Sequence, residues 1–144
     1  RLKLIKCALF DKVGKMDFYA STVSSSSCLV PSGTFNVPTG HLTRHPTIIF
    51  NKIEVECITL DYFVKSNNIK IIDYIWSDVN GAEKKLIGGG LEALNKCTKY
   101  LQLENMLDLL WEDKPTEVEL LSMLPNFEFI ERIDHNIILK NKFL

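Results

Sequence analysis

Apolar and polar positions change period several times along this chain, and each change marks an expected element. Residues 3–10 form a strand-like run, followed by the composition of a turn at 11–14. Residues 15–21 (KMDFYAS) alternate as in a half-exposed strand, and residues 47–60 are rich in β-branched side chains that favour one or two more strands. The Ser-, Pro- and Gly-rich segment 21–46 predicts a loop.

Strand and helix patterns alternate in the middle of the chain. Thr59 suits the N-cap of a short helix that Asn67 and Asn68 would end. Residues 71–76 (IIDYIW) are nearly all apolar, so we expect a strand covered on both faces of a parallel sheet. The triple glycine at 88–90 should separate two short helices. By residue number, the expected elements are a helix at 59–68, a strand at 71–76, helices at 81–87 and 91–97, and a strand at 99–104.

The end of the chain predicts a helix and a hairpin. Val118, Leu121 and Leu124 recur at helical spacing in TEVELLSMLP, and Pro125 should end that helix. Residues 127–141 alternate on both sides of a tight turn. Because strands alternate with helices, the predicted fold is α/β, with a mostly parallel sheet and a C-terminal antiparallel hairpin.

The composition is that of one globular domain spanning residues 1–144. Hydrophobic residues make up 46% of the chain, and 17 basic against 18 acidic residues leave a net charge of −1. This balance gives no electrostatic reason to expect nucleic acid or an anionic membrane as a partner, and no apolar run approaches the roughly 20 residues of a membrane helix. Arg1 leads almost directly into a strand-like run, so we expect further residues upstream.

The cysteines predict free thiols. They form no C-x-x-C pair, and the start of the chain has no signal-peptide pattern, so we expect a reducing, cytoplasmic location. The four cysteines are Cys7, Cys28, Cys57 and Cys97.

Carboxylates follow two of the predicted strands. In open α/β sheets, ligands bind beyond the carboxyl ends of the strands. Asp78 and Glu104 end two successive strands and Ala8–Asp11 end the first, so parallel strands would bring them to one edge. The alternative for Asp78 is a turn residue that accepts a hydrogen bond from a backbone amide. Asn80 and Glu83 also fit a helix-capping pattern, with Asn80 as N-cap and Glu83 reaching back.

Weaker motifs favour structural explanations. The glycines of IGGGLEAL follow a predicted helix, whereas a phosphate-binding loop needs them between a strand and a helix. His41 and His45 have the i, i+4 spacing of metal ligands on a helix, but Pro46 follows and the surroundings predict a loop. We expect His135, in the hairpin turn, and the pair Lys84–Lys85 to be solvated.

Several longer motifs occur in a specific order. SDVNGAE (77–83) follows the predicted buried strand, after CALFDKVGKMDFYAS (7–21) and ITLDYFVKSNNI (58–69), and before YLQLE (100–104) and LLSMLPNFEFIE (120–131). In this order they resemble the FkbM family of methyltransferases, whose motifs include A-L-x-D-x-x-G-x-x-x-F-Y, T-L-D-x-F and I-D-hydrophobic-E/Q-G-A-E. The resemblance covers nearly the whole chain. It departs from the family at Asn80, which replaces Glu or Gln, and at Trp76, where the family often has Lys.

The resemblance implies a fold and an activity. The fold would be a Rossmann-like, seven-stranded methyltransferase sheet, here lacking its first two strands, so that residues 1–144 would be the C-terminal two-thirds of the domain. The cofactor would be S-adenosyl-L-methionine. The acceptor would be a hydroxyl on a sugar or a related small molecule.

The resemblance also implies roles for the residues at the sheet edge. Asp78 would orient the acceptor hydroxyl or take its proton. The acidic wall that it forms with its neighbours could also hold a divalent cation, although we assign no metal ligands. The expected catalytic residues are Asp78, Glu83 and Glu104, and the expected cofactor-binding residues are Ala8, Leu9, Asp11, Asp78, Val79 and Asn80.

Two other functions fit the same residues. One is a non-catalytic α/β module, a decayed or partial methyltransferase that acts in binding or assembly. The other is a different nucleotide- or sugar-binding α/β enzyme, which would not bind adenosyl ligands. A sheet without its first strands would leave an unpaired edge, so we also expect self-association.

Overall fold

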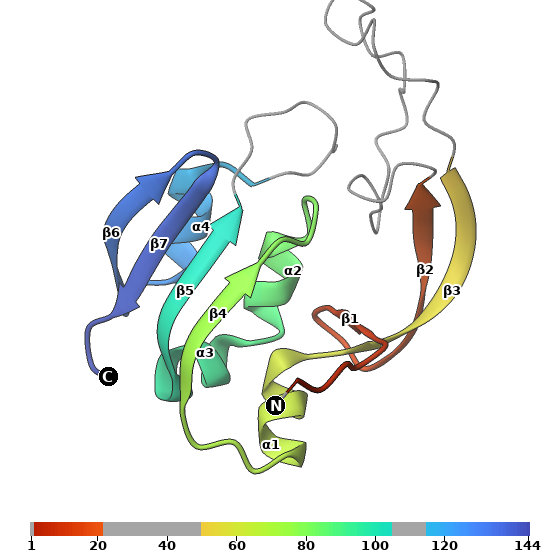
Figure 1. Cartoon of the computed structure of the whole chain (residues 1–144), viewed down its shortest axis with the longest axis horizontal. Helices are drawn as coiled ribbons and strands as arrows, with labels where there is room; N and C mark the ends of the chain where they lie inside the picture. The colour runs from red at the N-terminus through yellow and green to blue at the C-terminus, as the bar shows by residue number, and fades with distance from the viewer. Residues whose placement is uncertain (1, 22–49, 105–114) are drawn as a thin grey trace, which may run out of the picture.

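The computed structural model describes residues 2–21, 50–104 and 115–144. These residues form four helices and two sheets, with strand orders β1-β3-β2 and β4-β5-β7-β6 (Figure 1), which confirms a mixed α/β fold. The strands are β1 (Ala8–Leu9), β2 (Gly14–Ser21), β3 (Phe50–Ile58), β4 (Ile72–Ser77), β5 (Thr98–Glu104), β6 (Phe127–Ile133) and β7 (Asn136–Asn141). The helices are α1 (Leu60–Ser66), α2 (Glu83–Gly88), α3 (Leu91–Cys97) and α4 (Glu117–Met123).

The three-stranded sheet is built around β3. This strand pairs in parallel with β1 and antiparallel with β2. Its alternation puts Val55 on the half-buried face and Glu54 on the charged face, where Glu54 accepts a hydrogen bond from Lys15 at 2.7 Å. The strand predicted at 3–10 is reduced to Ala8–Leu9, because only these two residues pair with β3 and the side chains of residues 2–6 stay exposed.

The four-stranded sheet combines both strand directions. β4 runs parallel to β5, whereas β7 is antiparallel to β5 and to β6. Ile133 pairs with Asn136 across a turn in which Asp134 has a φ of 51°, so the predicted hairpin is confirmed. The prediction of a mostly parallel sheet is wrong for the described strands, since two of their pairs are parallel and three are antiparallel. The antiparallel pairs arise because β7 inserts between β5 and β6 and because β2 runs against β3.

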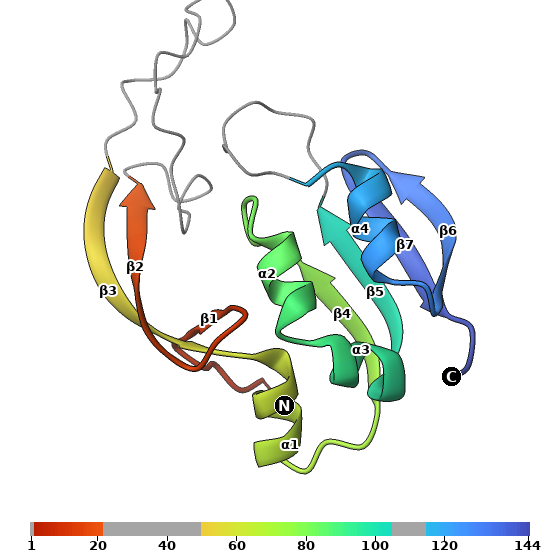
Figure 2. The same ribbon diagram turned by 180° about the vertical axis from the view of Figure 1, so that it is seen from behind.

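The hydrophobic core lies on one face of the four-stranded sheet. α2, α3 and α4 all lie on that side (Figure 2). Beneath them, the inward side chains of β5 and β7 are fully buried. The core residues with at most 2% exposure are Leu86, Ile87, Ala93, Leu94, Leu101, Leu103, Leu120, Leu124, Ile137 and Leu139.

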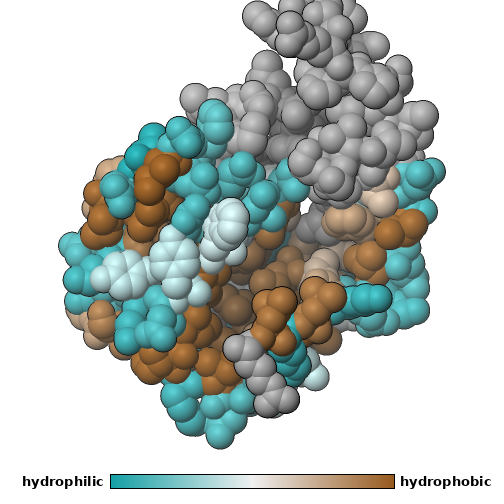
Figure 3. All heavy atoms as spheres, in the orientation of Figure 1, coloured by the Kyte–Doolittle hydropathy of each residue, from teal (hydrophilic) through white to brown (hydrophobic). Residues whose placement is uncertain are grey.

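The opposite face of this sheet is open. Tyr74, Trp76 and Tyr100 point away from the core and remain 47%, 70% and 38% exposed. In Figure 3, pale side chains of intermediate hydropathy gather over this face. Tyr74 and Tyr100 stack with their ring centroids 6.5 Å apart. The prediction that residues 71–76 are covered on both faces is therefore wrong, because in the described part of the chain helices pack on one face alone.

Helix α4 buries only part of the predicted stripe. Thr116 and Glu119 form a capping box at its start. Of the predicted residues, Leu124 is buried and Leu121 is partly buried against the core, but Val118 is 77% exposed and Leu120 is buried in its place. The short helix carries overlapping apolar stripes, and packing against the core selects the one that contains Leu120.

The triple glycine is a point of close packing as well as a helix break. α2 ends at Gly88 and α3 begins at Leu91, as predicted. A Cβ on Gly89 would lie 2.1 Å from the backbone oxygen of Phe10, and one on Gly90 would lie 2.9 Å from Cδ2 of Leu60. The junction therefore has no room for side chains where it meets the segment after β1 and the start of α1.

Two side chains fix the starts of α1 and α3. The hydroxyl of Thr59 accepts a hydrogen bond from the backbone N–H of Tyr62 at 2.9 Å, which confirms the predicted cap. The carboxylate of Asp61 accepts hydrogen bonds from the backbone N–H groups of Ala93, at 2.7 Å, and Glu92, at 3.3 Å. Asp61 thus caps α3 from a neighbouring helix.

Some predictions fall outside the described residues. They concern most of the loop at 21–46, with Cys28, His41 and His45. Cys7, Cys57 and Cys97 are free thiols, as predicted; the cytoplasmic location stays a prediction. Within the described ranges, the helices are too short or too polar for any of them to cross a membrane.

Candidate functional site

The carboxyl ends of β4 and β5 meet at one edge of the four-stranded sheet. The two strands stay in register up to the pair Ser77 and Leu103. Asp78, which follows β4, and Glu104, the last residue of β5, therefore lie side by side at the end of the sheet. Asp78 is exposed there, and Glu104 is half-buried at the register position of Asn136. These two carboxylates therefore share an edge, as expected for parallel strands.

The chain turns sharply after Asp78 through an Asn-Gly β-turn. The backbone N–H of Ala82 donates to the carbonyl of Val79 at 3.2 Å. Asn80 and Gly81 lie between them with φ values of 49° and 92°, the signs that a type I′ turn requires. The prediction of Asn80 as N-cap is wrong: Ala82 occupies that position and α2 has no side-chain cap. Asn80 is well suited to its turn position, because asparagine tolerates a left-handed backbone.

The side chain of Glu83 forms a hydrogen bond to this turn. It is the first residue of α2, and its side chain is almost fully buried, with 2% exposure. Its Oε1 accepts a hydrogen bond from the backbone N–H of Gly81 at 3.2 Å, so the predicted reach of Glu83 back toward the turn is confirmed. A carboxylate in the first helical turn also interacts favourably with the helix dipole. Glu83 therefore holds the segment that carries Asp78.

Asp78 itself has no structural partner among the residues that the structure describes. Its side chain is exposed and forms no hydrogen bond or ion pair there. The alternative role as a turn residue bonded to a backbone amide is thus not observed. Ser77, directly before it, is 3% exposed, and its hydroxyl has no hydrogen-bond partner in the described ranges.

Ala8, Leu9 and Asp11 belong to the other sheet and its following turn. Asp11 accepts a hydrogen bond from the ammonium of Lys85 at 2.9 Å, and that ammonium lies 5.5 Å from the centroid of the Phe10 ring. Asp11 is thereby tied to the flank of α2. The structure brings Asp78 and Glu104 to one edge of the sheet. Asp11 does not join them, because it is bonded to Lys85.

Ala8 lines a cavity of about 260 Å³. Phe18 and Val55 form apolar walls, and Lys6 and Cys7 complete the lining. Burial raises the pKa of the Cys7 thiol, and the nearby Cys57 raises it further, so the thiol is uncharged near neutral pH and Lys6 is the charged residue of the lining. The volume lies below the roughly 300–1,000 Å³ of most ligand pockets, so the cavity suits one part of a ligand.

Metal binding finds no support at this edge. In the ranges 2–21, 50–104 and 115–144, no three His, Cys, Asp or Glu side chains lie close enough together to hold a metal ion. The acidic residues at the carboxyl edge therefore do not form a ligand set by themselves.

Comparisons with known proteins identify the family. A family model described as the methyltransferase FkbM domain matches residues 1–133. The chain belongs to the FkbM methyltransferase family. The 2-O-methyltransferase NoeI of Sinorhizobium fredii (strain NBRC 101917 / NGR234) is 31% identical over 147 residues, an alignment that covers 98% of this chain and 60% of NoeI. The chain thus spans about 60% of the length of this curated relative. No solved structure matches the chain.

Two features of this region escaped the sequence analysis. Lys85 is exposed, as predicted, but nothing in the sequence links it to Asp11, which lies 74 positions earlier. The Asn80–Gly81 turn could have been found, because Asn-Gly is a strong type I′ signal. The overlapping N-x-x-E capping pattern concealed it.

Proposed function

We propose that this protein is an S-adenosylmethionine-dependent methyltransferase that acts on a hydroxyl of a sugar or a related small molecule. The observation that carries the proposal is the exposed, unpaired carboxylate of Asp78 among the described residues. Its carboxylate is exposed at the carboxyl edge of parallel strands and has no partner among the described residues, although the turn behind it is tightly held. Membership of the FkbM family supports methyl transfer, and the name of NoeI supports oxygen as the acceptor atom.

Asp78 would position the acceptor. S-adenosylmethionine, when bound, would supply a methyl group on a positively charged sulfur. The carboxylate of Asp78 would accept a hydrogen bond from the acceptor hydroxyl and hold its oxygen in line with that methyl group. As oxygen is methylated, the hydroxyl proton would pass to Asp78 or to water.

The other edge residues would act around Asp78. Glu83 would position it indirectly, since its carboxylate holds Gly81 and with it the turn. Glu104 would form the neighbouring wall of the acceptor site. Val79 and Asn80 would contact the cofactor side through the exposed part of the turn.

The residues near β1 fit one part of the cofactor. The apolar cavity beside Ala8 would accommodate an adenine ring, and Leu9 extends the same strand. The carboxylate of Asp11 fits a direct role less well, because it is already bonded to Lys85. Its role in the proposal is to fix the segment after β1 against α2.

We also propose that residues 1–144 are the C-terminal two-thirds of the methyltransferase domain, with two further strands of a Rossmann-like sheet supplied from upstream. Two observations support this. Among the described strands, β4 pairs with β5 alone, so its other backbone edge is open. The chain also spans 60% of NoeI. Through that edge the isolated chain would self-associate, which sedimentation at increasing concentration would measure.

The first test is calorimetric titration with S-adenosylhomocysteine. The 144-residue chain is compared with a longer version translated from further upstream in the same gene. We expect tight binding by the longer version and weak or no binding by the shorter one. If neither version binds, the methyltransferase proposal fails, and a non-catalytic α/β module becomes the better explanation.

The second test is Asp78→Asn in the longer version, assayed with S-adenosylmethionine and a panel of sugars. Methyl transfer should fall by roughly 100-fold, while S-adenosylhomocysteine binding is retained. Asp73→Asn is the matched control, because Asp73 lies on the same strand but pairs with Lys99 at 2.8 Å at the opposite end. Equal losses in the two variants would show that Asp78 does not position the acceptor.

A further inference from the structure

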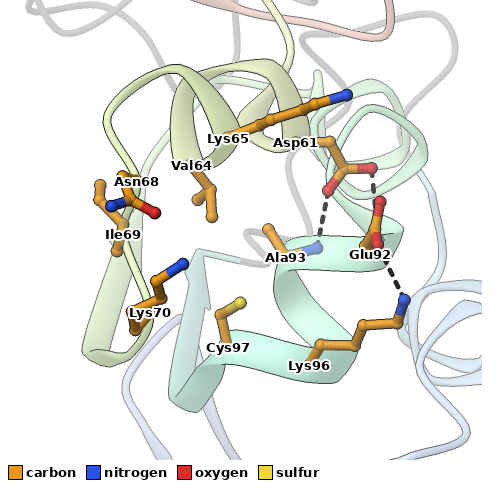
Figure 4. A pocket seen from close by; sticks show the side chains of 10 residues that line it. All are labelled: Asp61, Val64, Lys65, Asn68, Ile69, Lys70, Glu92, Ala93, Lys96 and Cys97. Carbon is orange, nitrogen blue, oxygen red and sulfur yellow. Dashed lines mark hydrogen bonds and ion pairs between the residues drawn. The ribbon is translucent and has the colours of Figure 1, made fainter.

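A second cavity lies at the opposite end of β4 from Asp78. Its volume is about 340 Å³, and it opens between α1, the segment that leads into β4, and α3 (Figure 4). Lys70 lies just before β4, and Cys97 is the last residue before β5. The length of β4, about 20 Å at the usual rise of a strand, separates this cavity from the carboxyl edge.

The interior of this cavity combines apolar walls with a few polar groups. Val64 and Ala93 are buried and face each other across it. In Figure 4, the ammonium of Lys70, the side-chain oxygen of Asn68 and the thiol of Cys97 point toward the same space. Small-molecule sites typically have this character, with hydrophobic walls and a small number of polar groups that set the orientation of the ligand.

The charges around the cavity do not balance. The carboxylate of Asp61 accepts hydrogen bonds from the backbone N–H groups at the start of α3. Glu92 is paired with Lys96 at 2.8 Å, and the ammonium of Lys96 points away from the cavity. Lys70 forms no ion pair with any described residue. The lining carries three lysines and two carboxylates, a net charge of +1, and Lys70 is the lysine whose ammonium faces the interior.

We propose that this cavity binds a small carboxylate with a short apolar body. The ammonium of Lys70 would donate hydrogen bonds to the carboxylate oxygens. Val64, Ile69 and Ala93 would cover the hydrocarbon part, which free phosphate lacks. The volume is near the lower end of the roughly 300–1,000 Å³ of ligand pockets, so the ligand is small. The site is separate from the proposed methyltransferase site and does not depend on it.

Cys97 provides a direct reporter of occupancy. The 144-residue chain is treated with iodoacetamide with and without 4-methylpentanoate, and the modification of each cysteine is followed by peptide mass spectrometry. We expect the carboxylate to slow alkylation of Cys97 severalfold and to leave Cys7, which lies outside this cavity, unchanged. Cys57 is 1% exposed and should stay unmodified, which verifies that the chain is folded. The neutral amide of the same acid and inorganic phosphate should protect Cys97 much less.

A matched pair of lysine variants tests the role of charge. Lys70→Gln should raise the 4-methylpentanoate concentration needed for half-protection about fivefold, as expected for one exposed charged contact. Lys65→Gln removes another exposed charge of the lining, whose ammonium points away from the interior in Figure 4, so it should change that concentration much less. The proposal is overturned if Cys97 is not protected, if the amide or phosphate protects it as well, or if both variants weaken protection equally.

Discussion

Leu101 and Tyr100 are neighbours on β5, yet the first is fully buried under helices and the second is 38% exposed on the open face. Their partners on β7, Leu139 and Lys140, repeat the same contrast. Strand alternation assigns these residues to opposite faces. It does not tell which face will be covered, because that depends on where the helices pack.

The two faces also differ in chemistry. The covered face is almost entirely aliphatic. On the open face, the hydroxyl of Tyr74 donates to the side-chain oxygen of Gln102, and the amide of Gln102 donates to Asn136 at 2.9 Å. These bonds link β4, β5 and β7 across the open face. The open face is therefore held together by aromatic and amide groups that tolerate water, while the covered face depends on the exclusion of water.

The largest expected effect separates the two faces directly. Leu101→Ala should lower the free energy of unfolding by about 3 kcal/mol, because it leaves a cavity in the core. Trp76→Ala removes a larger side chain from the open face and should cost less than about 1 kcal/mol. Denaturant unfolding of both variants measures the difference. Similar losses would show that the open face is covered in solution.

The second effect tests whether close packing at Gly89 fixes the position of α2 and α3. Gly89→Ala would place a Cβ 2.1 Å from the backbone oxygen of Phe10, so α2 and α3 must shift. We expect a loss of about 2 kcal/mol in unfolding free energy. Gly88→Ala is the control, since its Cβ would meet its nearest neighbour, Cβ of Asp11, at 4.0 Å. If both variants unfold at the same denaturant concentration, close packing at Gly89 does not fix the position of α2 and α3.

A third, smaller effect concerns the start of α3. Asp61→Ala removes the acceptor of two backbone N–H groups and should cost about 1 kcal/mol. Asp61→Asn keeps one acceptor oxygen and should cost less. Hydrogen exchange of the amides of Glu92 and Ala93 should accelerate in the alanine variant more than in the asparagine variant. Unchanged exchange rates would mean that contacts other than Asp61 hold the start of α3.

The smallest effect is a pH dependence of the contact between α2 and α4. The ammonium of Lys84 and the N–H and hydroxyl of Thr116 lower the pKa of Glu119 to about 2. Because the folded-state pKa lies below the ordinary value of 4.5, this contribution is fully present above about pH 4.5 and is lost as the pH falls toward 2.

Glu119→Gln should therefore destabilise the protein at neutral pH, and its difference from the unmodified protein should shrink with acidification. Urea midpoints measured from about pH 6 down to about pH 3 would follow this change. Glu128→Gln, on the open face, serves as a control for the removal of an exposed surface charge. A constant difference across the pH range would contradict the role given to Glu119.

The sequence was informative where a pattern had one physical meaning. Thr59 before an apolar helical stretch could be read as a cap, and the alternating tail could be read as a hairpin; the structure confirms both. The order of strands and carboxylates was also sufficient to place Asp78 and Glu104 at one edge.

The remaining features needed information that local patterns do not contain. Val118 and Leu120 lie on overlapping stripes of a short helix, and tertiary packing decided between them. Asn80 satisfied a capping pattern and a turn pattern at once, and the left-handed backbone resolved the choice. The link between Asp11 and Lys85 depends on how β1 packs against α2, which no short stretch of sequence records.

The position of β7 has a consequence for how the chain folds. It is the last described strand in chain order, yet it lies inside the sheet, between β5 and β6. The β6–β7 hairpin closes through a short turn and can form within about 1–10 μs. Pairing of β7 with β5 joins residues far apart in the chain and is slower. On the ribosome, β5 must therefore keep one edge unpaired until β7 has emerged, so the sheet is completed only in the last step of synthesis of these residues.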